Sequence, residues 1–135
     1  MRRLSSVLPL ALAALLLAVA GCGGSDESDE ESATPAEAVT EIDEIKTMLA
    51  TAVDQVRAGD ADAAEETVGD AYLEHFEHVE GPLGERDHDL MEELEEAIST
   101  DLRDDIKNGK SADEIEDAVE EIEDELDEAV KALRR

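Results

Sequence analysis

The chain has 135 residues and a strongly one-sided charge, with 39 acidic residues against 11 basic ones and a formal net charge of −28. A nucleic-acid binder needs a basic surface that displaces counterions, and this composition does not provide one. The single cysteine excludes a disulfide framework and a zinc ribbon, because both need several cysteines or a Cys/His cluster. A chain of this length is expected to form one small domain.

Residues 1–21 are typical of a secretory signal peptide. Two arginines precede an apolar run from Val7 to Ala20, which is shorter than the roughly 20 residues needed to span a bilayer. The run ends in Leu-Ala-Val-Ala-Gly-Cys, which resembles the lipobox of bacterial lipoproteins, where the chain is cut before a cysteine that is then lipidated. We therefore predict lipidation at Cys22. The alternative is an ordinary signal peptide followed by a chance cysteine.

Lipidation at Cys22 would hold the protein on the extracytoplasmic face of the cell membrane. Two acyl chains give a stable anchor, whereas one chain gives only marginal binding. Residues 22–34 comprise the cysteine and a run of small and acidic residues, which we expect to be a disordered linker because it has little apolar area to bury. Cleavage before Cys22 would leave nine basic residues against 39 acidic ones.

Residues 35–135 show the apolar periodicity of amphipathic helices. The first predicted helix runs from Pro35 to about Ala58, because Thr34 and Glu37 form a capping box and Gly59 supplies a stop signal. Its apolar residues recur at steps of three and four, which places them on one helix face.

Three further helices follow with short connections. The second is predicted from Asp60 to Glu80, where Gly81-Pro82 would stop it because proline cannot continue the backbone hydrogen bonds. The third is expected from near Asp87 to Asn108-Gly109. The fourth follows the capping box Ser111-Ala112-Asp113-Glu114 and extends to the basic C-terminal end.

No segment alternates with period two over a useful length, so the sequence predicts no strand. Four amphipathic helices with short connections predict an all-α, antiparallel up-and-down four-helix bundle over residues 35–135. Its core is expected to be aliphatic, apart from one aromatic pair. Tyr72 and Phe76 lie four residues apart on one helix and should pack together.

Residues 71–80 hold both aromatic residues and two of the three histidines. On a helix, Glu74, His75 and His78 share one flank of the apolar stripe, while Glu77 and Glu80 share the other. Imidazole with carboxylate suits a first-row transition metal, and carboxylates alone suit harder cations. A facing helix can add a further carboxylate, and the sequence offers four in residues 92–96, namely Glu92, Glu93, Glu95 and Glu96.

A plainer interpretation of this stretch is a solvated helix flank. Acidic residues are so frequent here that the Glu-x-x-Glu spacing recurs by chance, as in Glu92/Glu95 and Glu93/Glu96. The two histidines carry more weight because histidine is scarce in this chain. Catalysis has little support, since no serine lies in a Gly-rich elbow and no phosphate-binding loop is present. We therefore expect no enzyme.

The stretch Ala-Tyr-Leu-Glu-His-Phe-Glu-His-Val-Glu at residues 71–80, with Leu102-Arg103 and Gly109 further on, resembles a known pattern. It is similar to the extracytoplasmic helical domain that precedes the membrane part of bacterial high-affinity iron permeases. In that domain an Ala-Tyr-x-x-x-Phe-Glu-x-x-Glu helix is common. The resemblance covers about Ala50 to Leu133, and Glu77 and Glu80 match the carboxylate pair of the family.

The resemblance implies an accessory role in iron transport and not transport itself. The permeases carry several membrane helices with an Arg-Glu-Gly-Leu-Glu motif, which this chain lacks. The expected function is a membrane-tethered extracytoplasmic lipoprotein that binds or hands over iron or another divalent cation near a permease. The alternative is an interaction or spacer module that binds another membrane protein without a metal.

Overall fold

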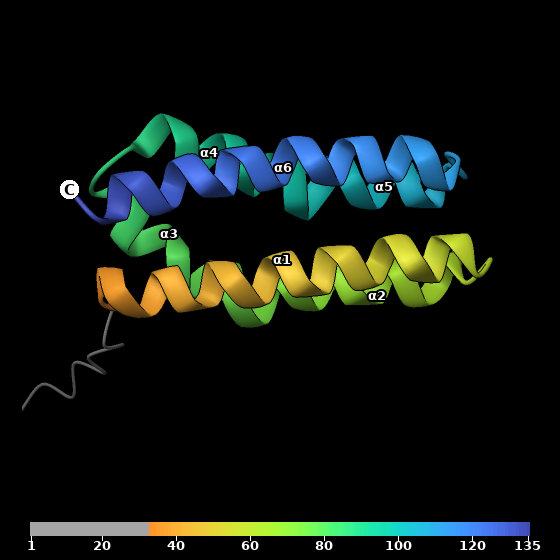
Figure 1. Cartoon of the computed structure of the whole chain (residues 1–135), viewed down its shortest axis with the longest axis horizontal. Coiled ribbons are helices and arrows are strands. Elements are labelled where there is room, and N and C mark those ends of the chain that lie inside the picture. The colour runs from red at the N-terminus through yellow and green to blue at the C-terminus, as the bar shows by residue number, and fades with distance from the viewer. Residues whose placement is uncertain (1–32) are drawn as a thin grey trace, which may run out of the picture.

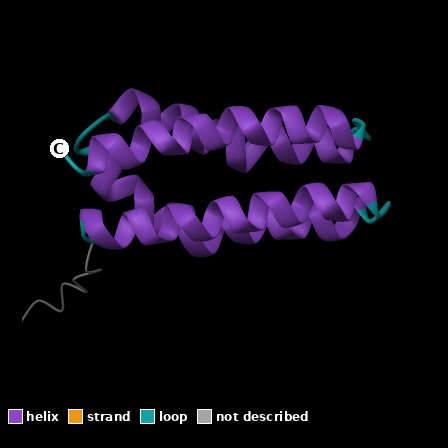
Figure 2. Cartoon of the chain, in the orientation of Figure 1, coloured by secondary structure: helices purple, strands orange, loops and turns teal. Residues whose placement is uncertain are grey.

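The computed structural model describes residues 33–135, which are almost entirely helical (Figures 1 and 2). The N-terminal helix is α1 (Pro35–Arg57) and the C-terminal helix is α6 (Ala112–Leu133). Two composite helices lie between them. One consists of α2 (Ala61–Asp70), η1 (Ala71–Phe76) and α3 (Glu77–Gly84), and the other of α4 (His88–Glu96), η2 (Ala97–Asp101) and α5 (Leu102–Lys107). Within residues 33–135 there are thus four helices and no strand.

The helix boundaries follow local signals in the sequence. Both predicted capping boxes are confirmed: the Thr34 hydroxyl accepts from the backbone N–H of Glu37 at 3.3 Å, and Ser111 does the same for Glu114. Gly59 and Gly109 follow the ends of α1 and α5 with φ of 83° and 74°, a left-handed conformation that suits glycine. These two glycines therefore allow the chain to leave the helix in the turn after α1 and in the turn after α5.

The four helices form one bundle, with α1 and α6 running lengthwise along it (Figure 1). Helix α1 lies against α2 and α6, α2 contacts α5, and α3 contacts α4. The turns after α1 and α5 lie at one end of the bundle. The turn between α3 and α4 lies at the other end, together with the start of α1 and the end of α6 (Figure 1). Figure 1 also shows α3 leaving the line of α2 and turning toward α4.

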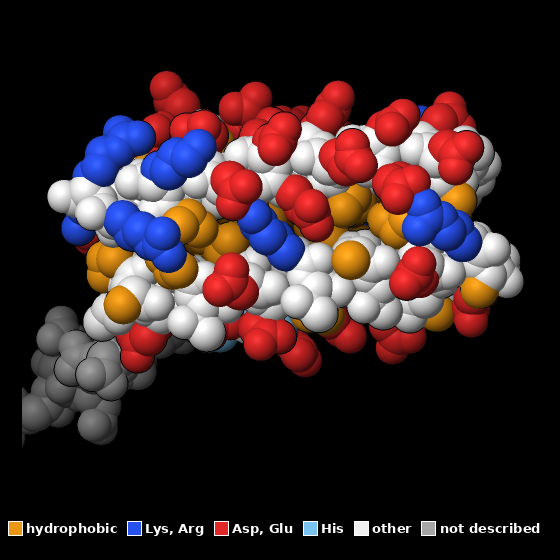
Figure 3. Space-filling view, in the orientation of Figure 1, with side chains coloured by type: hydrophobic (Ala, Val, Ile, Leu, Met, Phe, Trp, Pro, Cys, Tyr) orange, Lys and Arg blue, Asp and Glu red, His pale blue; other side chains and the backbone are white. Residues whose placement is uncertain are grey.

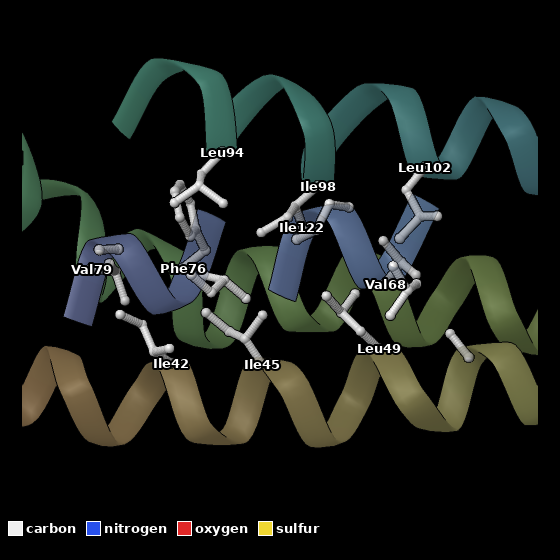
Figure 4. Close-up of a cluster of buried hydrophobic side chains, with 14 of the residues drawn as sticks. Ile42, Ile45, Leu49, Val68, Phe76, Val79, Leu94, Ile98, Leu102 and Ile122 are labelled. Carbon is white, nitrogen blue, oxygen red and sulfur yellow. The ribbon is translucent and has the colours of Figure 1, made fainter. Parts of the chain in front are cut away.

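The interior is filled by aliphatic side chains from all four helices, with Phe76 as its one fully buried aromatic residue (Figure 4). Figure 4 shows Ile45 of α1, Leu94 of α4 and Ile122 of α6 directed into this layer. No polar or charged residue of the described chain is fully buried. The predicted apolar stripes are therefore the core, and they are extended by small residues that the stripes omitted, such as Ala38, Ala52, Ala71 and Ala132.

The prediction that Gly81-Pro82 ends the second helix is wrong. Helix α3 continues through Pro82 to Gly84, and Pro82 and Leu83 are both buried. A proline inside a helix forfeits one backbone hydrogen bond and crowds the preceding turn. Here the proline stands in the last turn, where burying Pro82 and Leu83 against the core offsets that cost. The chain turns only at residues 85–87, where the Asp87 carboxylate caps α4 by accepting from the N–H of Leu90 at 3.3 Å.

Two short π-helical segments interrupt the composite helices, and the apolar periodicity did not predict them. In η1 the N–H of Glu77 bonds to the carbonyl of Tyr72, and in η2 the N–H of Leu102 bonds to that of Ala97. Each bond spans five residues instead of four, so each segment widens the helix and rotates the residues that follow. Such segments are frequent at functional sites, and η1 contains Tyr72 and His75.

Acidic side chains are scattered over the face seen in Figure 3, and several Lys and Arg side chains gather at the end that holds the C-terminus. Within residues 33–135, no helix has the length and apolar character that crossing a membrane requires. The predicted signal peptide, the lipidation site Cys22 and the linker up to residue 32 lie outside the described residues.

Candidate functional site

Tyr72 stands at the edge of the core, on the π-helical segment η1. Its ring stacks on Phe76 with 6.0 Å between centroids and 26° between planes, which confirms the predicted pairing. Phe76 is fully buried, whereas Tyr72 is only partly buried. The stack therefore holds the Tyr72 ring in place and directs its hydroxyl to the rim of the bundle, where carboxylates gather.

Together with burial, the charges of three carboxylates from two helices, Glu77, Glu80 and Glu95, act on the Tyr72 hydroxyl and raise its pKa. The hydroxyl lies 3.5 Å from Oε1 of Glu95 on α4, at the long limit of a hydrogen bond. Glu80 of α3 is half-buried, and its Oε1 is inaccessible to solvent and has no hydrogen-bond partner in the described residues. A phenol has one proton to donate, so Tyr72 serves one carboxylate at a time. We call Tyr72, Glu77, Glu80 and Glu95 the tyrosine–glutamate cluster.

The protonation equilibria of the cluster reflect its crowding. Burial raises the pKa of Glu80 above its ordinary value, and the negative charges of Glu95 and Glu77 add to the shift, while the Tyr72 hydroxyl opposes it. Burial and the charge of Glu80 raise the pKa of Tyr72 to about 12. No basic side chain contributes to either shift. The cluster therefore holds negative charge that lacks a cation.

His75 belongs to a different contact, on the side of the helix that faces α1. Its Nδ1 lies 2.7 Å from Oε2 of Glu41, and both side chains are half-buried. When the imidazole is protonated, this contact is an ion pair that joins η1 to α1. His75 is therefore bound to α1 and not to the other histidine on its own helix.

The predicted cluster of Glu74, His75 and His78 does not assemble as one site. Nδ1 of His78 lies 3.0 Å from the backbone carbonyl oxygen of Glu74, and both residues are exposed. Of the five residues predicted as metal ligands, only Glu77 and Glu80 lie in the cluster around Tyr72. In the conformation described, residues 33–135 contain no three His, Cys, Asp or Glu side chains placed to hold a metal ion.

A second acidic surface lies between the α4–α5 helix and α6. Glu93, Asp101, Glu121 and Glu125 line a hollow of about 440 Å³ there. Burial raises the pKa of Glu125, with the charges of Glu93 and Glu121 adding to the shift, and its Oε2 is buried without a partner. This hollow has no hydroxyl or imidazole among its lining residues, so it differs from the cluster around Tyr72.

The sequence did not single out two of the residues that the structure brings to these contacts. Glu95 was one of four equivalent carboxylates at residues 92–96, and only the packing of α3 against α4 selects it. Glu41 gave no signal, because it lies among polar positions of a helix distant in sequence from His75. The intervals between charged residues reveal neither contact, since both depend on how helices face one another.

Comparisons with models of known families, with curated proteins and with solved structures found no match to this chain.

Proposed function

We propose that this chain is a lipid-tethered extracytoplasmic accessory protein whose helical bundle binds iron or another divalent cation near a permease. The single observation that carries the cation site is the buried, unpartnered Oε1 of Glu80, which faces a region containing the charges of Glu77 and Glu95 and the Tyr72 hydroxyl. A bound cation would neutralise these charges and give the buried oxygen a partner. Oxygen donors of this kind suit hard cations.

Binding would need a rearrangement of side chains, because no ligand set is assembled in the absence of a cation. Glu77 is exposed and Glu95 is half-buried, so both have room to change rotamer. Glu80 and Tyr72 are held by burial and stacking and would form the fixed part of the site. The acidic surface would also raise the local concentration of cations around it.

The remaining parts of the proposal rest on the sequence. The lipobox-like residues 17–22 support a lipid anchor at Cys22 on the extracytoplasmic face of the membrane. The resemblance of residues 71–80 to the soluble domain of iron permeases supports iron as the cation and a permease as the partner. The positions of the three turns support an antiparallel up-and-down arrangement of the four helices (Figure 1).

One observation favours a second function, a protein-interaction or spacer module without a metal. In residues 33–135 no metal-holding group is preassembled, and the one large apolar side chain that is highly exposed is Leu73, at 57%. A spacer needs only a stable bundle, and the capped helices contribute to that stability. The two functions are separated by whether a cation binds at a defined place.

The experiment is a titration of residues 22–135, carrying Cys22→Ser, with ferrous, ferric, zinc and magnesium ions. Calorimetry and thermal unfolding should both respond, because a cation that binds only the folded state raises the melting temperature. We expect one cation to bind with a 1:1 stoichiometry that persists in 0.15 M salt. The Glu80→Gln and Glu95→Gln variants should each weaken binding at least tenfold.

Two control variants locate the site. Glu74→Gln/His78→Gln changes the exposed flank, and His75→Gln breaks the contact with Glu41, so both should leave binding unchanged. Loss of binding in the His75 variant would instead place the site at the α1 contact. Binding that disappears in moderate salt and is equal in every variant would contradict a specific site and favour the interaction module.

A further inference from the structure

Three arginines at one end of the bundle have no acidic partner among the described residues. Residues 33–135 contain nine basic side chains, of which six form ion pairs with carboxylates: Lys46, Arg57, Arg103, Lys107, Lys110 and Lys131. Within the same range no ion pair involves Arg86, Arg134 or Arg135, although acidic residues outnumber basic ones several-fold. We call these three residues the arginine end.

The arginine end coincides with the place where the N-terminal segment joins the bundle. Arg86 lies in the α3–α4 turn, and Arg134 and Arg135 follow α6, so all three lie at the end where α1 begins (Figure 1). Arg134 and Pro35 line the same apolar hollow of about 410 Å³, together with Val39 and Leu133. Lys and Arg side chains gather at this end in Figure 3. Apolar walls strengthen ion pairs because they lower the local dielectric constant.

The local sequence does not account for all three unpaired charges. The dipole of α6 favours cations in its last turn, which explains the position of Arg134 and Arg135. It does not explain Arg86, which lies in a turn. The neighbouring Asp87 carboxylate already accepts from the N–H of Leu90, and Lys131 already pairs with Glu128. All three arginines are exposed, so they are accessible to a further segment of the chain.

We propose that the acidic segment of residues 26–31 docks on the arginine end. The segment reads Asp-Glu-Ser-Asp-Glu-Glu and supplies five carboxylates, and only Ser32 and Ala33 separate it from Thr34. Glu31 precedes Thr34 by three residues, so the Cα atom of Glu31 can lie up to about 10 Å from that of Thr34. The corresponding limit for Asp26 is about 28 Å. A short covalent connection gives an effective concentration in the millimolar range. Arginine is suited to this occupant because its guanidinium binds carboxylates in a bidentate manner.

Docking of this segment would fix how the bundle stands on the membrane. The inference rests on the proposed function for the tether at Cys22, which lies four residues before Asp26. With the segment docked, the tether would leave the bundle at the arginine end, and that end would face the lipid at a short distance. With the segment released, the same residues would act as an extended, self-repelling spacer.

A double-mutant cycle tests the docking. The starting protein is residues 22–135 with Cys22→Ser, in a chelating buffer so that cation binding does not contribute. One change neutralises the segment, with Asp26→Asn, Glu27→Gln, Asp29→Asn, Glu30→Gln and Glu31→Gln. The other neutralises the arginine end, with Arg86→Gln, Arg134→Gln and Arg135→Gln. All eight positions lie on the segment or at exposed sites, so the core is unchanged.

We expect a favourable coupling between the two changes in about 10 mM salt, seen as a roughly fivefold difference in the unfolding equilibrium constant. The coupling should vanish in about 1 M salt, where the Debye length is about 3 Å. Lys107→Gln/Lys110→Gln, which changes the opposite end, should show no coupling with the segment. A zero or unfavourable coupling in low salt would overturn the proposal, because repulsion between the segment and the bundle would then dominate.

A membrane arm distinguishes the segment from the lipid surface as the occupant. The same protein is mixed with vesicles that contain phosphatidylglycerol. No binding is expected, since the arginines are occupied and the rest of the chain is acidic. Binding that is lost on neutralising the arginines would overturn the proposal in favour of a lipid contact. Neither arm uses a metal, so failure of the cation site and failure of the docking are separate results.

Discussion

Glu65 and Glu80 lie on the same composite helix, 15 residues apart, in opposite electrostatic surroundings. Oε1 of Glu65 lies 2.9 Å from both Arg103 and Lys107 of α5. These two cations hold the pKa of Glu65 below its ordinary value, with Lys107 as the larger cause. Glu80 faces Glu77 and Glu95 without a cation, and its pKa is raised. One carboxylate is satisfied by the fold, and the other is not.

This difference separates a structural carboxylate from one that is available for a ligand. The paired Glu65 joins α2 to α5 and needs nothing further. Glu80 has no cationic partner. The Tyr72 hydroxyl lowers its pKa, but its Oε1 is inaccessible to solvent and lacks a hydrogen bond, and such an acceptor carries a free-energy cost. A cation or a proton would relieve that cost. The comparison therefore predicts that neutralising Glu80 stabilises the folded protein, whereas neutralising Glu65 destabilises it.

The largest change in the free energy of unfolding is expected when the buried Phe76 ring, which packs against Tyr72 of the tyrosine–glutamate cluster, is removed. Phe76→Ala deletes a fully buried ring that stacks on Tyr72, so unfolding by denaturant should show a loss of roughly 3–5 kcal/mol. Cation affinity should fall with it, because Tyr72 loses its support.

Leu102→Ala is the matched control for Phe76→Ala on the paired side of the bundle. It should cost a comparable amount, roughly 2–5 kcal/mol, since Leu102 is 1% exposed and lies next to Arg103. It should leave cation affinity unchanged while the protein is folded. Equal loss of affinity in both variants would mean that cation binding follows overall stability and not the cluster.

A smaller change in stability, this time a gain, is expected for substitution of Glu80. Glu80→Gln should stabilise the protein at pH 7 by about 1 kcal/mol, because it removes a half-buried negative charge that faces Glu77 and Glu95 without a cation. A carboxyl group whose pKa is raised in the folded state contributes stability that is lost as the pH rises through that value. The advantage of Glu80→Gln should therefore disappear on acidification below the ordinary pKa of a glutamate, about 4.3. Urea unfolding at pH 7 and below that pKa measures the difference, and destabilisation at pH 7 would contradict the description of Glu80 as lacking a cationic partner.

The smallest effect is expected at the paired position. Glu65→Gln should lower the melting temperature slightly at pH 7, since exposed ion pairs contribute little. A carboxyl group whose pKa is lowered contributes stability that is present at neutral pH and lost on acidification through that value. The penalty should therefore fade on acidification, and it should weaken in 1 M salt. Thermal unfolding by circular dichroism, with Glu66→Gln as an exposed neighbour for control, would reveal it.

Local rules predicted the helices and their capped ends well. Thr34, Ser111, Gly59 and Gly109 act through hydrogen bonds and backbone angles within a few residues, so their effect can be read from adjacent positions. The prediction that the helix ends at Pro82 was wrong because the local preference of proline competes with the burial of Pro82 and Leu83. That burial depends on which other helices pack against this turn. The contacts of Tyr72 and His75 with other helices were not predicted for the same reason.

The sequence by itself determined that residues 35–135 form four amphipathic helices and that Tyr72 pairs with Phe76. Only the tertiary structure decided which residues of the other helices each flank of the α2–α3 helix meets. It set Glu77 and Glu80 near Glu95 of α4, placed His75 against Glu41 of α1, and left Glu74 and His78 exposed. Periodicity gives the direction of a side chain around its own helix, but the partner it meets is set by helix packing and by the extra rotation of the π-helical segment.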